Sequence, residues 1–162
     1  MCGWIGVMNR RRFISRLVKL ALGGLAFFVK LAPSRAAQPV FDLEHIREYP
    51  PGTVTHLIFQ EAFIVSDQEG VYALSSICTH QGGPIFKTEK NDAFVCKRHH
   101  SRFDLAGNVV RGPAQKPLTW LRLELSREKR LILYRAQAGE RGVKISHADG
   151  SKIRSAAPTP AA

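Results

Sequence analysis

Two short stretches of this chain each hold a cysteine and a histidine at close spacing, and they constrain the fold more than any other feature. Cys78 and His80 form a C-x-H pair, and Cys96 and His99 form a C-x-x-H pair. Fifteen residues separate His80 from Cys96. Two thiolates and two imidazoles suit a soft or borderline metal. The fold must therefore bring two loops together around a metal centre, which is either a tetrahedral zinc or an iron–sulfur cluster.

The way the ligands are divided between the two loops favours the cluster. Structural zinc sites usually take paired cysteines from one motif and paired histidines from another. Here each loop supplies one cysteine and one histidine. This division suits a cluster with two unlike irons, one held by two thiolates and the other by two imidazoles, with each loop giving one ligand to each iron.

At these residues the sequence resembles the Rieske [2Fe-2S] family. The two motifs match the family signature, and residues 107–114 are similar to the glycine- and proline-rich loop that covers the cluster in this family. The resemblance runs from about Pro50 to Tyr134. It implies one Rieske-type [2Fe-2S] cluster, and it assigns the four ligands to Cys78, His80, Cys96 and His99.

The resemblance also implies roles for the residues around the ligands. The two cysteines would bind an inner iron that stays ferric, and the two histidines would bind the outer iron that takes the electron. Imidazoles in place of thiolates raise the reduction potential above that of an all-cysteine cluster. Five further residues are expected to line the cluster: Ser101, Phe103, Gly82, Gly112 and Pro113.

Two departures from the family pattern bear on the reduction potential and on the loops. Ser101 stands where the family often has a serine whose hydroxyl bonds a bridging sulfide, but Phe103 stands where high-potential members have a tyrosine. The missing hydroxyl predicts an intermediate potential, below the high-potential quinol-oxidising type and above the ferredoxin type. Gly83 and Arg98 stand where some members join the two loops by a disulfide, so the loops should be held by packing and by the metal.

Short β-rich runs separated by turns predict an all-β domain over residues 38–136. Residues 85–88 and 93–96 read as a hairpin whose ends lie next to the two metal loops, which explains how the ligands meet. No helical pattern longer than about two turns is evident in this region. We expect an antiparallel β-sandwich with a metal-binding hairpin subdomain, as the resemblance also implies, preceded by an N-terminal signal or anchor helix.

The net charge of +11 is concentrated at the two ends of the chain. Residues 1–37 hold seven Lys/Arg and no acids, residues 38–125 have a net charge of −1, and residues 126–162 have +5. A nucleic-acid-binding domain would need a basic face with groove-reading elements, and the near-neutral middle excludes that class. Residues 137–162 are polar and basic and are predicted to form a weakly ordered tail.

Residues 1–37 read as an export leader. Residues 9–14, Asn-Arg-Arg-Arg-Phe-Ile, resemble a twin-arginine signal, and residues 17–31 form an apolar run. The run is short for a membrane span but can serve as an anchor when extended back to Ile14. Small residues at 32–37 resemble a cleavage site. We expect the domain on the periplasmic side of a bacterial inner membrane, attached through this N-terminal helix.

Together these features predict an electron-transfer subunit with no catalytic site of its own. The favoured hypothesis is the iron–sulfur subunit of a quinol–cytochrome c reductase-like, bc-type complex, with quinol, a cytochrome b-type partner and a c-type cytochrome acceptor. One alternative is the small subunit of an exported molybdenum oxidoreductase similar to arsenite oxidase, with a molybdopterin partner. A second is a structural Cys2His2 zinc module. A ring-dioxygenase ferredoxin is disfavoured by the leader.

Overall fold

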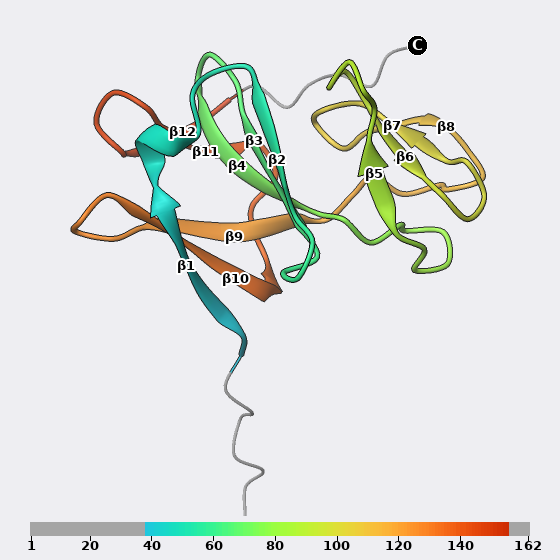
Figure 1. Cartoon of the computed structure of the whole chain (residues 1–162), viewed down its shortest axis with the longest axis horizontal. Helices are drawn as coiled ribbons and strands as arrows, with labels where there is room; N and C mark the ends of the chain where they lie inside the picture. Colours follow the sequence, from blue (N-terminus) through green and yellow to red (C-terminus); the bar gives the residue numbers. More distant parts are fainter. Residues whose placement is uncertain (1–37, 156–162) are drawn as a thin grey trace, which may run out of the picture. The chain divides into compact units, whose positions relative to one another are not determined.

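The structure is a computed structural model that describes residues 38–155, and β-strands are its main regular elements (Figure 1). The first four strands are β1 (Val40–His45), β2 (Thr53–Leu57), β3 (Ala62–Ser66) and β4 (Gly70–Ser75). The next four are β5 (Ile85–Lys87), β6 (Phe94–Cys96), β7 (Arg102–Phe103) and β8 (Val109–Arg111). The last four are β9 (Trp120–Leu125), β10 (Arg130–Ala138), β11 (Val143–Ser146) and β12 (Lys152–Arg154). A short 3-10 helix, Ile46–Glu48, follows β1.

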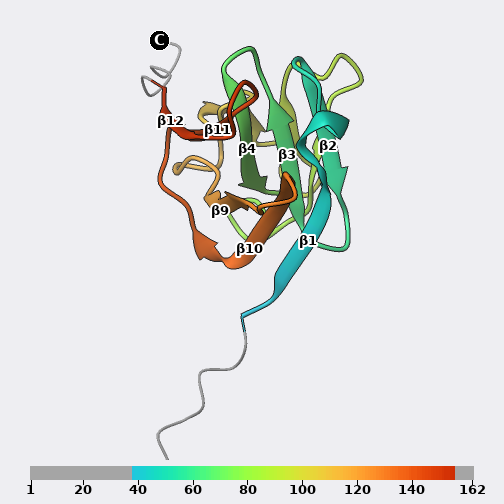
Figure 2. The same ribbon diagram turned by 90° about the vertical axis from the view of Figure 1, so that its left-hand side faces the viewer.

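The strands within the described range form two antiparallel sheets. The larger has the order β1-β10-β9-β4-β11-β12, and β3 and β2 continue from the other edge of β4 (Figure 2). The smaller has the order β5-β6-β7-β8 and is inserted between β4 and β9 in the chain. The expected all-β fold of antiparallel sheets is confirmed, including the hairpin at β5 and β6. The expected N-terminal helix lies outside the described residues.

Strands β3 and β4 are buried on both faces, so their sequences are nearly continuous apolar runs. Side chains of successive residues point to opposite faces of a sheet. On one face they join a core that includes both motif cysteines: Phe63, Val65, Tyr72, Leu74, Ile85, Phe94 and Phe103. On the other face they join a core inside the larger sheet: Ala62, Ile64, Val71, Ala73, Leu123, Leu131 and Leu133. The first core attaches the small sheet to the large one.

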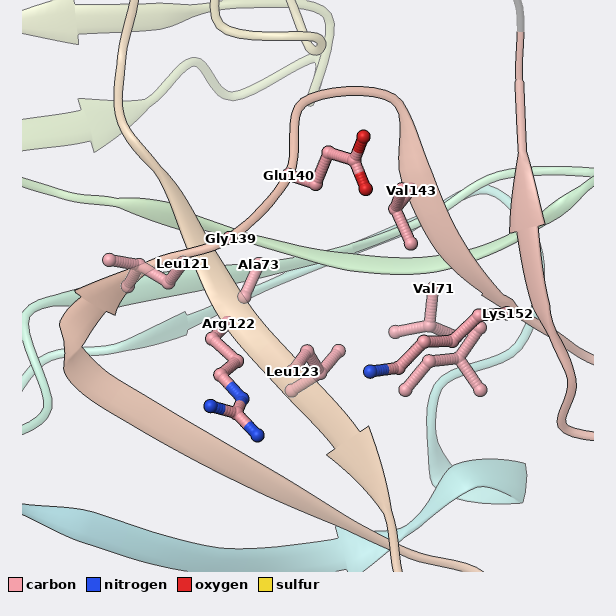
Figure 3. A pocket seen from close by; sticks show the side chains of 10 residues that line it. Val71, Ala73, Leu121, Arg122, Leu123, Gly139, Glu140, Val143 and Lys152 are labelled. Atoms are coloured by element: carbon pink, nitrogen blue, oxygen red, sulfur yellow. The ribbon is translucent and has the colours of Figure 1, made fainter.

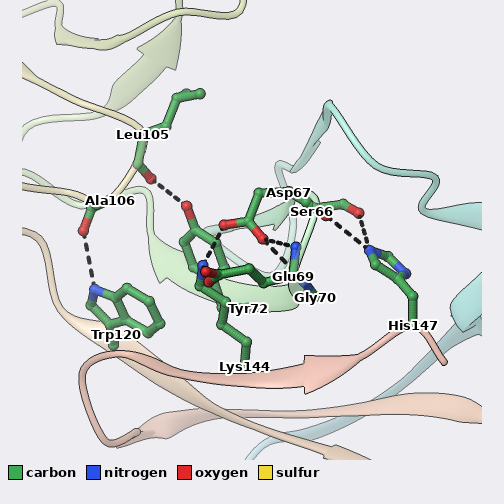
Figure 4. Close-up of polar contacts among 10 residues, drawn as sticks. All are labelled: Ser66, Asp67, Glu69, Gly70, Tyr72, Leu105, Ala106, Trp120, Lys144 and His147. Atoms are coloured by element: carbon green, nitrogen blue, oxygen red, sulfur yellow. Dashed lines mark hydrogen bonds and ion pairs between the residues drawn. The ribbon is translucent and has the colours of Figure 1, made fainter. Parts of the chain in front are cut away.

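Two aromatic side chains of the larger sheet also bind the smaller subdomain through hydrogen bonds. The rings of Tyr72 and Trp120 stack with their centroids 4.4 Å apart. The Tyr72 hydroxyl donates to the carbonyl of Leu105 at 3.0 Å, and Trp120 Nε1 donates to the carbonyl of Ala106 at 3.1 Å (Figure 4). Burial raises the pKa of the Tyr72 hydroxyl, which therefore stays protonated and remains a donor.

The prediction of a weakly ordered tail from residue 137 is wrong for residues 143–154. Strand β11 pairs with β12 and with β4, where Ile145 lies opposite Val71. The buried Lys144 of β11 donates to Asp67 at 2.5 Å and to Glu69 at 2.6 Å, both in the turn between β3 and β4 (Figure 4). Ile145 is fully buried and Lys144 is paired with two carboxylates. The segment is therefore a strand of the larger sheet, although its basic composition suggested disorder.

Within residues 38–155 no helix is long and apolar enough to cross a membrane.

Candidate metal centre

The first cysteine–histidine motif lies in the loop between β4 and β5. The loop closes on itself, because Cys78 N–H donates to the Gly83 carbonyl at 2.8 Å and Gly82 N–H donates to the Cys78 carbonyl at 2.9 Å. Gly82 has a φ of 64°, which favours glycine, because a Cβ atom would crowd the backbone there. The Thr79 hydroxyl donates to the Lys116 carbonyl at 2.6 Å and holds this loop against the segment that precedes β9.

The second motif lies between β6 and β7. His100 N–H donates to the Cys96 carbonyl at 3.0 Å, and Cys96 N–H donates to the Ser101 carbonyl at 2.9 Å, so a tight turn carries His99. His100 has a φ of 59°, a conformation that a residue with a side chain rarely adopts. Lys97 N–H donates to the Pro84 carbonyl at 3.1 Å and links the second loop to the first. The pairing of β5 with β6 therefore brings together the two motifs that sequence separates.

A third loop, residues 112–114 directly after β8, is held against the site by Ser101. The Ser101 side chain is fully buried, and its hydroxyl oxygen accepts a hydrogen bond from Ala114 N–H at 2.9 Å. The same side chain hydrogen-bonds Cys78. Ser101 thus contacts a predicted ligand and orients the covering loop. Gly112 and Pro113 lie exposed in this loop, joined by a cis peptide bond.

The four predicted ligands come together as two like pairs. The Nδ1 atoms of His80 and His99 face each other at 3.2 Å, with the ring centroids 4.9 Å apart. The Cys78 and Cys96 side chains are buried, are not disulfide-bonded and lie near enough to each other to perturb the pKa of Cys78. The cysteine pair therefore lies inside the small subdomain, whereas His99 is exposed.

The surroundings of the two thiols differ. Burial raises the pKa of Cys78. Burial acts in the same direction on Cys96, but the backbone N–H groups of His99 and Arg98 donate to its sulfur and hold its pKa below the ordinary value. Donors directed at a sulfur stabilise the thiolate, which is the form that binds metals.

This paired arrangement fits a two-iron cluster better than a single zinc ion. Two imidazole nitrogens bound to one tetrahedral metal lie about 3.3 Å apart, given metal–nitrogen bonds of about 2.0–2.1 Å. The observed Nδ1 separation of 3.2 Å is close to that value. The cysteine pair is buried inside the subdomain, whereas His99 of the histidine pair is exposed, so the two pairs lie at different depths of the site. Two like pairs of ligands meet the requirement of a cluster that holds one iron by thiolates and the other by imidazoles.

Phe103 lies beside the cysteines, and Gly83 and Arg98 lie where the two metal loops touch. Phe103 is fully buried beside the cysteines in the core of the small subdomain and supplies no polar hydrogen. Gly83 packs against the second loop so closely that an added Cβ atom would lie 3.0 Å from Arg98 Cβ and 3.1 Å from Cys96 Sγ. Arg98 extends in the other direction, where Nη1 donates to the Gln81 carbonyl at 3.0 Å. A non-covalent contact therefore joins the two loops at the positions where the sequence resemblance suggested that a disulfide is absent.

The contact between Arg98 and Gln81 and the contact between Thr79 and Lys116 could not be found from the sequence, because neither involves a residue type or spacing that marks a site.

A separate hollow of about 110 Å³ lies on the larger sheet beside β9 and β11, lined by residues such as Leu121, Leu123 and Glu140 (Figure 3). None of the predicted ligands lines it.

Comparison with known proteins supports the same assignment. A curated relative from Cyanothece sp., a cytochrome b6-f complex iron-sulfur subunit, is 32% identical over 78 residues, which are 48% of this chain and 41% of the relative. The protein of the same name from Synechococcus elongatus is 30% identical over 81 residues, 50% of this chain and 43% of the relative. The chain thus spans less than half the length of these relatives.

Solved structures resemble the chain at a lower level. A plasma membrane Rieske protein from Synechocystis covers 49% of this chain with 82% of its own, at 23% identity and a TM-score of 0.40. A chain of a hyperthermophilic respiratory Complex III covers 75% of this chain with 99% of its own, at 21% identity and a TM-score of 0.45. Likenesses of this size carry no functional conclusion.

The family model for the Rieske [2Fe-2S] domain matches residues 39–125, which include both motifs, the serine and the covering loop. The matched region is more than half of the chain. This match, together with the two like pairs of ligands, shows that the chain belongs to the Rieske family and carries a Rieske-type [2Fe-2S] cluster.

Proposed function

We propose that this chain is the electron-transferring iron–sulfur subunit of a bc-type complex, in which a cytochrome b-type partner oxidises a quinol and a c-type cytochrome accepts the electron. The observation that carries the proposal is the orientation of the site, with the thiols buried and His99 exposed at the end of the small subdomain. The curated relatives, which are subunits of cytochrome b6-f complexes, support the type of complex.

The residues of the chain have separable tasks in this function. When bound, the cluster accepts and releases one electron at a potential raised by its imidazole ligands. Cys78 and Cys96 would hold it from inside the subdomain, where their burial excludes water. His80 and His99 would hold it from the accessible side, so that a partner can approach within electron-transfer distance. Ser101 keeps the covering loop closed over the site through Ala114.

The leader supports a location outside the cytoplasm. The arginines at positions 10–12 and the apolar run after them are features of a twin-arginine signal that remains as an anchor. We therefore place the domain on the periplasmic side of a bacterial inner membrane. Changing Arg10→Lys and Arg11→Lys together should leave the folded protein in the cytoplasm. Unchanged export of that variant would contradict this route.

The first test of the function is spectroscopic. Full-length protein from iron-supplied cells should be red-brown, contain two irons and two sulfides as a [2Fe-2S] cluster requires, and give a rhombic EPR signal after dithionite reduction. A redox titration would then give the potential, which we expect to lie between the ferredoxin and the high-potential quinol-oxidising types. Colourless protein with stoichiometric zinc would refute electron transfer.

The second test concerns the complex. Affinity-tagged full-length chain, isolated from gently solubilised membranes of its own host, should bring with it a b-type cytochrome detectable by its haem spectrum. Isolation with a molybdopterin subunit instead would assign the chain to an exported molybdenum oxidoreductase and overturn the bc-type proposal.

A further inference from the structure

Charge is segregated between the two parts of the described fold, although the middle of the sequence is almost neutral. Residues 38–76 and 119–155, which form the larger sheet, hold ten Lys/Arg and ten Asp/Glu. Residues 77–118, which carry the metal loops and the small sheet, hold seven Lys/Arg and three Asp/Glu, a net charge of +4. The part of the molecule that exchanges the electron is therefore the positively charged part.

Four of these cations lie in or beside the three loops of the metal site, and we call them the tip cations: Lys97, Arg98, Arg111 and Lys116. The first two separate the ligands of the second loop. Arg111 directly precedes Gly112 in the covering loop, and the Lys116 carbonyl accepts the hydrogen bond from Thr79 between the ligands of the first loop. All four side chains are exposed, and among residues 38–155 none of them forms an ion pair.

The carboxylates of the small subdomain lie away from this tip or are already engaged. Glu89 and Asp92 occupy the turn between β5 and β6, at the end of the hairpin opposite the metal loops. Asp104 is half-buried and accepts hydrogen bonds from the backbone and side chain of Asn108. From the larger sheet, Glu61 lies near Gly82 but is ion-paired with Arg135. The tip cations are thus not neutralised by the carboxylates of the described fold.

We propose that the tip cations form a docking surface for an acidic electron-transfer protein, whose carboxylates surround its own redox centre. The proposal rests on the electron-transfer function above and names the charge of the partner. A protein partner is favoured over anionic lipid because the exposed His99 shares this surface, and a bilayer pressed against it would block the route of the electron. Uncompensated charge around a redox centre accelerates the encounter with a partner of opposite sign by about 10- to 1000-fold at low salt.

The test compares two acceptors that differ only in charge. The dithionite-reduced full-length protein, freed of excess dithionite, is mixed in a stopped-flow instrument with a basic c-type cytochrome or with the same cytochrome succinylated on its lysines. We expect the succinylated, acidic form to be reduced about tenfold faster at low ionic strength. Its rate should fall as salt is added and the Debye length shortens, whereas the rate of the basic form should rise. A faster reaction of the basic form at low salt would overturn the proposal.

A charge-reversed variant shows whether the tip cations, and not the net charge of the protein, determine the preference for the acidic cytochrome. The double variant Arg111→Glu/Lys116→Glu should lose the preference for the acidic cytochrome or reverse it. The control Lys90→Glu/Arg127→Glu changes the net charge equally at two exposed residues remote from the metal loops, and it should keep the sign of the salt dependence. If both double variants changed the preference for the acidic cytochrome equally, the net charge of the protein would determine the reaction rate. That result would overturn the proposal that the tip cations form the docking surface.

Two further readouts separate this inference from its alternatives. Failure of the electron-transfer function would appear as absence of the rhombic EPR signal and of any reaction with either cytochrome. An intact signal without a charge preference would overturn only the docking surface. Loss of that preference, together with cosedimentation with anionic phospholipid vesicles that required Arg111 and Lys116, would assign the surface to lipid instead.

Discussion

Gly83 and Arg98 meet where the two metal loops touch, and the absence of a side chain at the first residue leaves room for the second. An added Cβ atom at Gly83 would lie 3.0 Å from Arg98 Cβ. Arg98 in turn donates to the Gln81 carbonyl and links the two loops without a covalent bond. The loops are therefore held by a polar contact that water can compete with, as well as by packing.

This contact predicts that a disulfide can be introduced. Cβ atoms of a disulfide lie about 3.5–4.5 Å apart, so the loops need to separate by only a few tenths of an ångström. The double variant Gly83→Cys/Arg98→Cys should form the cross-link and stabilise the cluster-free protein by about 3 kcal/mol, the value for a loop of about 15 residues. Thermal unfolding with and without reductant measures it.

The control for the disulfide is the single variant Arg98→Cys, which loses the hydrogen bond to Gln81 and gains no cross-link. It should be less stable than the parent by about 1 kcal/mol. Because Cys96 Sγ also lies near position 83, peptide mapping must establish which cysteines are joined. A correctly formed cross-link that left the unfolding temperature unchanged would contradict this prediction, and would mean that strain in the folded state offsets the constraint on the unfolded chain.

Ser101 is expected to act on both the covering loop and the redox potential. Replacing Ser101→Ala leaves the buried Ala114 N–H without its acceptor, which costs about 1–3 kcal/mol of folding stability. It also removes a hydrogen bond to Cys78, so the reduced, more negative state is less stabilised and the potential should fall. Chemical denaturation and a redox titration give the two quantities. Ser101→Thr, which keeps the hydroxyl, is the matched control, and equal potentials in both variants would contradict the role of that hydroxyl.

A substitution at Phe103 is expected to raise the reduction potential, which is the opposite of the change expected for Ser101→Ala. A Phe103→Tyr substitution adds one hydroxyl within the buried core beside the cysteines. If the new donor favours the reduced state by about 1 kcal/mol, the potential should rise by about 40 mV, since 59 mV corresponds to about 1.4 kcal/mol for one electron. Protein-film voltammetry measures the shift. An unchanged potential in a correctly folded variant would mean that the hydroxyl does not reach a ligand sulfur.

The ion pairs of Lys144 predict how stability responds to acid. Burial alone would raise the pKa of Asp67, but hydrogen bonds from Lys144 and from backbone N–H groups outweigh it and lower the pKa. A hydrogen bond from Lys144 also lowers the pKa of Glu69. Folded-state pKa values below the unfolded ones confer stability above about pH 4, and this stability is lost as pH falls through the folded values.

Lys144→Met should therefore destabilise the fold by about 1–2 kcal/mol near pH 7. This cost is smaller than the cost of breaking a fully buried ion pair, because solvent screens both carboxylates. It should also flatten the decline in stability between about pH 5 and pH 2. Urea denaturation across this range measures both effects. Arg154→Met, which breaks an exposed pair with Glu140, should change stability by less than about 0.5 kcal/mol. An identical acid slope in Lys144→Met and the parent would contradict the linkage.

Much of the fold and the ligand set could be predicted because the signals are local. Motif spacing identified four candidate ligands, and the hairpin between them follows from short apolar runs around the turn at residues 89–92. The β11 and β12 strands were missed because pairing of β11 with β4 joins residues that are more than 70 positions apart. Only burial of Ile145 and the pairing of Lys144 with distant carboxylates turn that basic segment into a strand.

The sequence by itself determined the chemistry of this protein: two thiols and two imidazoles in motifs that resemble one family, a serine retained and a tyrosine lost. Those properties reside in residue identity and short spacing. The tertiary structure decided how the ligands pair and that Gly83 and Arg98 meet between the loops. It also decided that cations gather near the metal loops, whereas the larger sheet has no net charge. Distances and charge distribution depend on which distant segments pack together, and packing is a property of the whole fold.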